Sequence, residues 1–215
     1  MNLTSKSFID GAPIPGEFAF AVIDPVNHIA ISTNRNPHLA WSDAPAGTKS
    51  FALICHDYDV PSRADDVNQE DRDIPESLPR DIFFYWVLVD IPATVREIPA
   101  GSHSNRVTPN GKPGPDAPEG ARHGINDYTK WFAGDADMKG DYYGYDGPCP
   151  PWNDLLVHHY IFTLYALDVP HIQVGGDLTG PNVRLAITDH ILTQASLIGT
   201  YTLNPRVQQS SLSHK

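Results

Sequence analysis

The sequence predicts a single domain of the larger all-β or α/β kind, and three observations indicate this class. With 215 residues, the chain is long enough to bury most of the surface that its unfolded form would expose. Several apolar runs have the length and the branched and aromatic composition of strands, whereas one segment alone shows a helical period. We expect this domain to span residues 1–205 and the polar residues 206–215 to form a frayed tail.

The composition argues against two classes of protein. Asp and Glu number 26 against 15 Lys and Arg, for a formal net charge of −11, and no run of basic residues occurs. We therefore expect no nucleic-acid partner, because the basic surface that follows a phosphate backbone is missing. The N-terminus lacks an apolar signal core, and no segment has the ~18 consecutive apolar residues of a membrane span. These features predict a soluble protein of the cytoplasm.

The N-terminal part of the chain predicts three strands. Residues 8–24 alternate weakly in hydrophobicity around two Pro/Gly breaks, which is typical of a short strand, a turn and a second strand. The apolar run Ser50–His56 predicts a buried strand that ends in polar side chains. Alternation along this strand places Cys55, Asp57 and Asp59 on one face.

The middle of the chain alternates between loops and one strongly apolar strand. Arg63–Arg80 is charged and interrupted by prolines, so we expect a surface loop that contributes nothing to the core. Residues 81–93, DIFFYWVLVDIPA, predict a fully buried central strand. Gly101–Tyr142 has no sustained period, and a loop of this length inside a domain is more often functional than a linker.

The C-terminal part predicts one strand and one helix. Val157–Val169 has the branched and aromatic content of a strand, and its alternation places His158 and Tyr160 on the same face. In Leu178–Ile198, apolar residues recur at helical spacing, and Gly199 follows as a stop signal. We therefore predict a helix over that segment.

Several residues near the ends of these strands could carry chemistry, but each also has a structural interpretation. Carboxylates at a strand end, such as Asp57, most often cap turns or face solvent. A histidine and a tyrosine within a strand are most often core groups, and Tyr85 lies among packing aromatics. Cys55 and Cys149 leave either a single bridge or two free thiols open, and the lack of a secretory signal favours free thiols. Neither HExxH nor a paired CxxC motif occurs, so the sequence predicts no metal and no other cofactor.

An ordered set of motifs resembles the phosphatidylethanolamine-binding protein family, and more narrowly its bacterial and archaeal Raf-kinase-inhibitor-like branch. These motifs are DYDVPSR at residues 57–63, FYWVLVDIPA at 84–93, GPCPP at 147–151 and HHY at 158–160. The resemblance extends from about Phe8 to Tyr201. It implies a mainly β fold: an antiparallel β-sandwich of two sheets with short peripheral helices and a C-terminal helix. It also implies a small anion-binding pocket at one end.

The same resemblance assigns residues to that pocket. The implied ligand-binding residues are Asp57, Asp59, Tyr85, Cys149, Pro150, Pro151, His158 and Tyr160, and no catalytic residue is implied. Tyr85 stands where the family usually has a histidine, which removes one potential cation from the pocket. An adjacent Asp57 would raise the pKa of His158, so anion binding is expected to weaken above about pH 7.

These features lead to one leading hypothesis and two alternatives. The leading hypothesis is a regulatory binding protein for a small anionic ligand, either phosphorylated or similar to a phospholipid head group. The first alternative is an inhibitor of a kinase or protease that acts through protein contact. The second is an enzyme with Asp57 and His158 as an acid/base pair, assisted by Tyr160 or Cys149. It ranks last because no nucleophile, base and orienting group occur together. An exposed aromatic such as Trp152 could also cover an edge in a homodimer.

Overall fold

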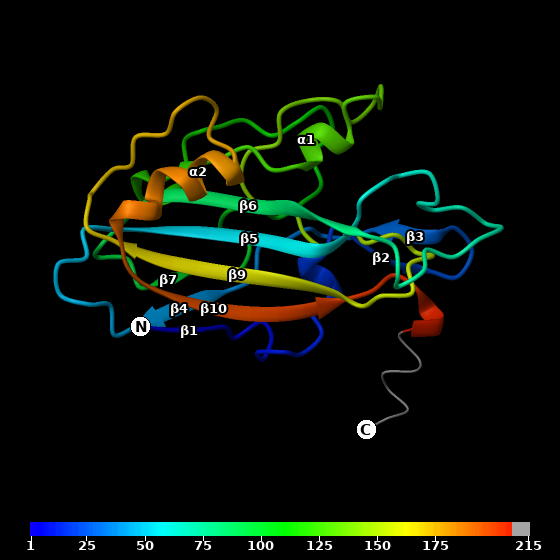
Figure 1. The fold of residues 1–215 in the computed structure, drawn as a ribbon, viewed down its shortest axis with the longest axis horizontal. Coiled ribbons are helices and arrows are strands. Elements are labelled where there is room, and N and C mark those ends of the chain that lie inside the picture. Colours follow the sequence, from blue (N-terminus) through cyan, green and yellow to red (C-terminus); the bar gives the residue numbers. More distant parts are fainter. Residues whose placement is uncertain (208–215) are drawn as a thin grey trace.

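The fold is built on one large antiparallel sheet (Figure 1). The computed structural model describes residues 1–207. The strand order of this sheet is β10-β9-β5-β6-β8. Its members are β5 (Ser50–Pro61), β6 (Arg80–Pro92), β8 (Arg122–His123), β9 (His158–Leu167) and β10 (Ile191–Tyr201). The predicted strands at 50–56, 81–93 and 157–169 are therefore confirmed.

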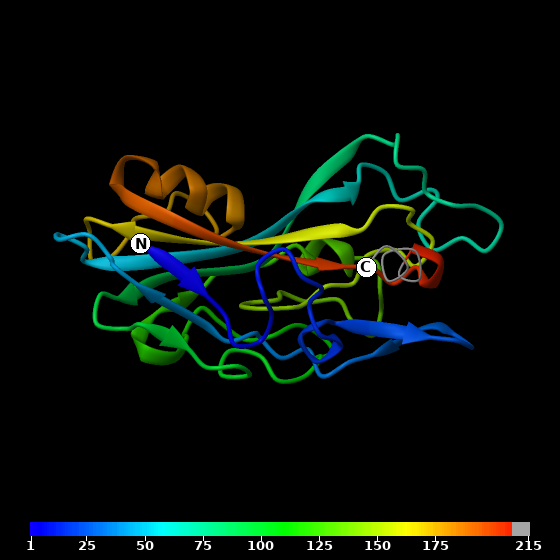
Figure 2. The same ribbon diagram turned by 90° about the horizontal axis from the view of Figure 1, so that it is seen from below.

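A second layer lies against one face of the large sheet (Figure 2). It holds a three-stranded sheet of order β1-β4-β7 and a separate hairpin, β2-β3. Its strands are β1 (Asn2–Thr4), β4 (Leu39–Ser42), β7 (Glu97–Ile98), β2 (Ala21–Asp24) and β3 (His28–Ile31). The mainly β, antiparallel sandwich implied by the family resemblance is confirmed. The first strand expected within residues 8–24 is absent, since β1 lies earlier in the chain and β2 is the one strand of that segment.

The helices are short and peripheral, as expected. They are η1 (Gly16–Phe18), η2 (Pro118–Gly120), α1 (Tyr128–Trp131), α2 (Gly180–Ile187) and η3 (Thr188–His190). α2 covers the outer face of the large sheet (Figure 2). The predicted helix over Leu178–Ile198 is wrong beyond residue 190, because the chain then becomes β10 and pairs with β9. Gly199 lies within β10 and is therefore not a helix stop.

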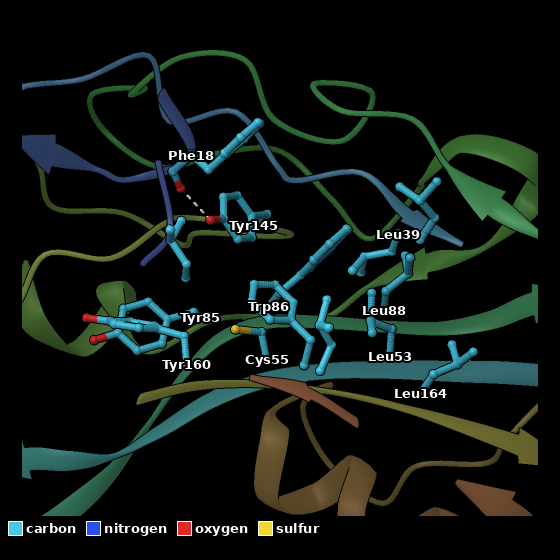
Figure 3. Close-up of a cluster of buried hydrophobic side chains, with 14 of the residues drawn as sticks. Phe18, Leu39, Leu53, Cys55, Tyr85, Trp86, Leu88, Tyr145, Tyr160 and Leu164 are labelled. Carbon is cyan, nitrogen blue, oxygen red and sulfur yellow. Dashed lines mark hydrogen bonds between the residues drawn. The ribbon is translucent and has the colours of Figure 1, made fainter. Parts of the chain in front are cut away.

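Two apolar cores lie on the two faces of the large sheet. The larger core lies between the sheet and the second layer and includes Trp86, Tyr145 and the buried Cys55 (Figure 3). The smaller core lies between the sheet and α2. The loop 63–80 also contributes to burial, contrary to the sequence prediction, because Ile74 is 0% exposed and Leu78 is 9% exposed. Ile74 is fixed there by backbone hydrogen bonds to Asn153 and Leu155.

Residues 208–215, most of the predicted frayed tail, lie outside the described residues. That residues 1–205 form one domain stays a prediction.

Candidate functional site

A pocket of about 870 Å³ lies at the end of the sandwich where β5 ends and β6 and β9 begin. Five of the eight predicted site residues line it: Tyr85, Cys149, Pro150, Pro151 and His158. Most of the remaining wall is apolar or aromatic, and it includes Phe20, Ile29, Ile31, Phe83, Tyr128 and Phe132. Five predicted residues thus share one pocket, which is much larger than a site for a small anion alone.

His158 lies between two carboxylates at the inner end of the pocket. Its Nδ1 is 2.6 Å from Asp57 Oδ2, and its Nε2 is 3.1 Å from Asp154 Oδ2. His158 and Asp57 are 0% exposed and the Asp154 side chain is 1% exposed. Arg80 binds Asp154 through two hydrogen bonds, Nη1 to Oδ2 at 2.6 Å and Nη2 to Oδ1 at 3.1 Å. A buried charge is stable only when it is paired in this way.

These contacts determine the charges of the cluster. Burial by itself would lower the pKa of His158, but the hydrogen bonds to Asp154 and Asp57 and their negative charges raise it to about 9. Burial would raise the pKa of Asp154, yet hydrogen bonds from His158 and Arg80 bring it below its usual value. His158 is therefore protonated at neutral pH, and it lies between two acidic side chains.

The arrangement limits what His158 can do. Both of its ring nitrogens donate to carboxylates when the ring is protonated. The imidazole thus has no free nitrogen to accept a proton from a substrate, and it can act on an anion through its charge without giving up a hydrogen bond. The observed contacts do not favour the acid/base alternative that pairs His158 with Asp57.

Two tyrosines form the second part of the site. The rings of Tyr85 and Tyr160 pack edge to face with centroids 4.9 Å apart, and Figure 3 shows both hydroxyl groups on the same side of the core. The Tyr160 hydroxyl is buried and has no hydrogen-bond partner within the described chain. Burial, followed by neighbouring Tyr85, raises the pKa of Tyr160, although the two hydroxyl groups do not meet the geometry of a hydrogen bond. Burial, followed by neighbouring Asp57, raises the pKa of Tyr85, so its hydroxyl remains a hydrogen-bond donor.

The side chains of Asp57 and Asp59 do not share a face, although strand alternation predicts that they do; the contact between them is from Asp59 N–H to Asp57 Oδ1 at 2.6 Å. The register of β5 against β6 shifts between Asp57 and Val60, and the shift interrupts the alternation. Asp59 Oδ2 instead accepts hydrogen bonds from the backbone N–H of His159, at 2.9 Å, and from its Nδ1, at 2.8 Å. The His159 side chain is 54% exposed, so this pair lies toward solvent.

The proline-containing edge of the pocket is fixed by a buried polar network. Asp146 is 0% exposed, accepts hydrogen bonds from Asn34 and Asn126, and pairs with Lys112. Asn34 also accepts a hydrogen bond from the backbone N–H of the next residue, Gly147, at 2.8 Å. Two residues later, burial raises the pKa of the Cys149 thiol to about 12, and Cys149 is therefore a neutral group in the pocket wall.

Sequence reasoning missed Asp154 and Arg80. Asp154 precedes His158 by four residues, but the segment between them is loop, and no periodicity determines where a loop side chain points. Arg80 is the first residue of β6 and was assigned to the end of a solvated loop.

Residues 1–207 hold no group of three or more His, Cys, Asp or Glu side chains that could bind a metal ion. Among the same residues, no helix has both the length and the apolar character that crossing a membrane requires. Both cysteines are free thiols.

Comparisons with known proteins match nearly the whole chain. A family model described as phosphatidylethanolamine-binding protein matches residues 4–202. The UPF0098 protein YbhB of Escherichia coli (strain K12) is 30% identical over 203 residues, which cover 94% of this chain and 100% of that protein. A UPF0098 protein of Methanothermobacter thermautotrophicus is 31% identical over 205 residues and is covered to 98% of its length, against 94% of this chain. The crystal structure of E. coli YbcL, described as a new member of the mammalian PEBP family, has a TM-score of 0.63 at 26% identity and covers 94% of this chain and 97% of that one.

Proposed function

The chain belongs to the phosphatidylethanolamine-binding protein family, and on this premise we propose that it binds a small anionic ligand in the pocket and that binding has a regulatory role. Membership of the family supports a ligand-binding protein in general terms. The proposal adds the ligand's class, a phosphorylated compound or one similar to a phospholipid head group. The proposed site residues are Asp57, Asp59, Tyr85, Cys149, Pro150, Pro151, His158 and Tyr160.

The observation that carries the proposal is the pocket wall in which Tyr85 and the charged ring of His158 lie together. Burial raises the pKa of Tyr85, so its hydroxyl stays protonated and can donate to an acceptor oxygen of a ligand. Tyr160 packs against Tyr85 but does not line the pocket. Anionic oxygens form the stronger hydrogen bonds with such donors.

Two cations lie at this place, together with acidic side chains. His158 is charged at neutral pH because Asp154 and Asp57 hold it in that state, and their carboxylates also offset its charge. Asp81 lies in the same wall. Arg63 lies in the pocket wall and forms no ion pair with any of residues 1–207. An anion would give Arg63 a charged partner, whereas Lys130 in the same wall already pairs with Asp127 at 3.0 Å.

The remaining residues have supporting roles in the proposal. Pro150 and Pro151 hold the pocket edge rigid, which lowers the ordering cost of binding. Cys149 contributes a neutral wall beside them. Asp59 orders the start of β9 through His159, since it accepts hydrogen bonds from both the backbone and the ring of that residue.

Titration with inorganic phosphate and with phosphorylethanolamine, followed by NMR or calorimetry, tests the proposal. We expect saturable binding to the wild-type protein and a loss of about tenfold or more in affinity for Tyr85→Phe, because the variant lacks a donor to a charged group. Tyr143→Phe is the matched control, since Tyr143 lies outside the pocket, and should bind as the wild type does. If neither compound binds the wild-type protein saturably, the proposal is wrong and the protein-contact alternative becomes the leading one.

The inhibitor of a kinase or protease remains the alternative, and a stoichiometric partner recovered by pull-down would support it. The cytoplasmic location and the homodimer stay predictions. Trp152 offers less support for a dimer than expected, because its ring stacks on His28 of the same chain and is half-buried.

A further inference from the structure

Three segments that are distant in the sequence meet in one contact at the rim of the pocket. The rings of His28 and Trp152 stack with centroids 3.8 Å apart and an interplanar angle of 9°. His28 Nε2 lies 2.8 Å from Glu70 Oε1. His28 begins β3, Glu70 belongs to the loop between β5 and β6, and Trp152 follows the proline edge. None of these three side chains lines the pocket itself.

Each segment also supplies part of the pocket wall. β3 contributes Ile29 and Ile31, the loop between β5 and β6 contributes Val67 and Asn68, and the proline edge contributes residues 150–151. The contact among His28, Glu70 and Trp152 therefore holds three walls of one pocket together from outside. We call this contact the clasp.

Two of the three segments are already joined by other bonds. The Asn153 side chain accepts a hydrogen bond from the backbone of Asn68 at 3.0 Å and donates to the carbonyls of Asp66 at 2.8 Å and Arg72 at 2.9 Å. The backbone N–H of Trp152 donates to Asn68 Oδ1 at 3.1 Å. The loop and the proline edge thus form one unit, and the clasp adds the tip of the hairpin to it.

The tip of the hairpin is weakly held, whereas its base is anchored, because Ala21 N–H donates to Pro148 O at 3.5 Å and the Tyr201 hydroxyl donates to Ala21 O at 2.8 Å. β2 and β3 pair only with each other, and an isolated two-stranded ribbon is marginally stable in water. The hydrogen bonds of its turn are internal, from the backbone of Val26 and Asn27 to Asp24 Oδ1. Val26 is 82% exposed. Beyond partial packing of Ile23 and Ile29, the polar and ring contacts that tie this tip to the rest of residues 1–207 all pass through His28.

We propose that the clasp is a gate that controls access to the pocket. When the stack of His28 on Trp152 and the pair with Glu70 separate, the hairpin tip moves away and takes the wall residue Ile29 with it, while Ile31 stays at the anchored base opposite Ala21. The functional consequence rests on the ligand-binding role proposed above, since a gate regulates the entry and release of the ligand.

The pocket contains its own probe for this motion, because Cys149 lines the wall and Cys55 is buried at 1% exposure in the core. The rate of alkylation of Cys149 by iodoacetamide, assigned by peptide mass spectrometry, reports how often the pocket opens. We expect His28→Ala to raise this rate about tenfold and Glu70→Gln about twofold, from the usual strengths of a ring stack and of an exposed ion pair.

His190→Ala is the matched control. His190 pairs with Asp168 at 2.9 Å and has the same 40% side-chain exposure as His28, but it lies near the opposite end of β9. Its variant should alkylate at the wild-type rate. Hydrogen exchange gives the second readout: backbone amides of residues 22–31 should exchange faster in His28→Ala and at the wild-type rate in His190→Ala.

Two results would overturn the gate. One is an unchanged alkylation rate in His28→Ala. The other is faster alkylation without faster exchange in residues 22–31, which would mean that only the proline edge had loosened. Neither measurement needs a ligand, so they decide the gate even if phosphorylethanolamine fails to bind and the proposed function is wrong. If phosphorylethanolamine binds, its association and dissociation rates should both rise in His28→Ala with little change in affinity.

Discussion

His158 is charged because carboxylates lie on both sides of its ring. Its folded-state pKa of about 9 lies above the ordinary value of 6.5, so folding favours the protonated form. The resulting stability is fully present below about pH 6.5 and is lost as the pH rises through about 9. Since one pKa unit corresponds to 1.36 kcal/mol, this pKa shift contributes about 3 kcal/mol to the free energy of unfolding.

Urea unfolding of the wild-type protein and of His158→Gln, at pH values below 6.5 and above 9, measures this contribution. The wild-type free energy of unfolding should fall over that interval relative to the variant. His159→Gln is the control, because its ring is 54% exposed and its pairing with Asp59 is at the surface. Parallel pH profiles for the wild type and His158→Gln would contradict the assigned charge.

The same residues show how far sequence reasoning reaches. Alternation in β9 correctly placed His158 and Tyr160 on one face, and both are buried. The predicted pH at which His158 loses its proton, about 7, is too low, because the prediction included Asp57 but not Asp154. Asp59 was misplaced since strand periodicity holds only where the register is unbroken. These errors come from a loop and a bulge, whose geometry depends on distant parts of the chain.

The C-terminal strand β10 shows a different limit. Its residues include Ile191 and Ala195, which fit a helical period that begins in α2, but hydrogen bonding to β9 makes the segment a strand. Short apolar segments commonly fit both periods, and the available partner strand decides between them. Within this strand, Gly199 has no room for a side chain, since an added Cβ would collide with Ile14.

Gly199→Ala should therefore destabilise the protein by about 1–3 kcal/mol through overpacking. Ile14→Ala by itself should also destabilise it, because Ile14 is 2% exposed, but the double variant should be more stable than the sum of the two single effects predicts. Urea unfolding of the four proteins in the cycle measures this coupling. Additive effects would contradict the packing of Gly199 against Ile14.

The sequence named five residues that share one pocket, but it did not indicate the size of that pocket. The family resemblance implied a small site at one end of a sandwich, and the strand ends that carry Tyr85 and His158 do meet there. Its volume of about 870 Å³ comes from walls supplied by the hairpin, by α1 and by two long loops. The packing of such segments against one another is a tertiary property that local periodicity does not contain.

The net charge of −11 acts on the ligand before any of these walls do. It repels an anion at long range, whereas His158 and Arg63 attract it only near the pocket. Raising the ionic strength from about 10 mM to about 150 mM shortens the Debye length from ~30 Å to ~8 Å, which screens the distant repulsion more than the buried attraction. The association rate of inorganic phosphate should therefore rise with salt, by about twofold.

Arg63→Met separates the local attraction from the field of the whole molecule. This variant should bind phosphate more weakly at every salt concentration, because it lacks a cation in the pocket wall, yet its association rate should keep the same upward salt dependence. An association rate that falls with salt in the wild type and becomes flat in Arg63→Met would show instead that Arg63 dominates the encounter. In that case the acidic surface would be too far from the pocket mouth to influence which anions enter.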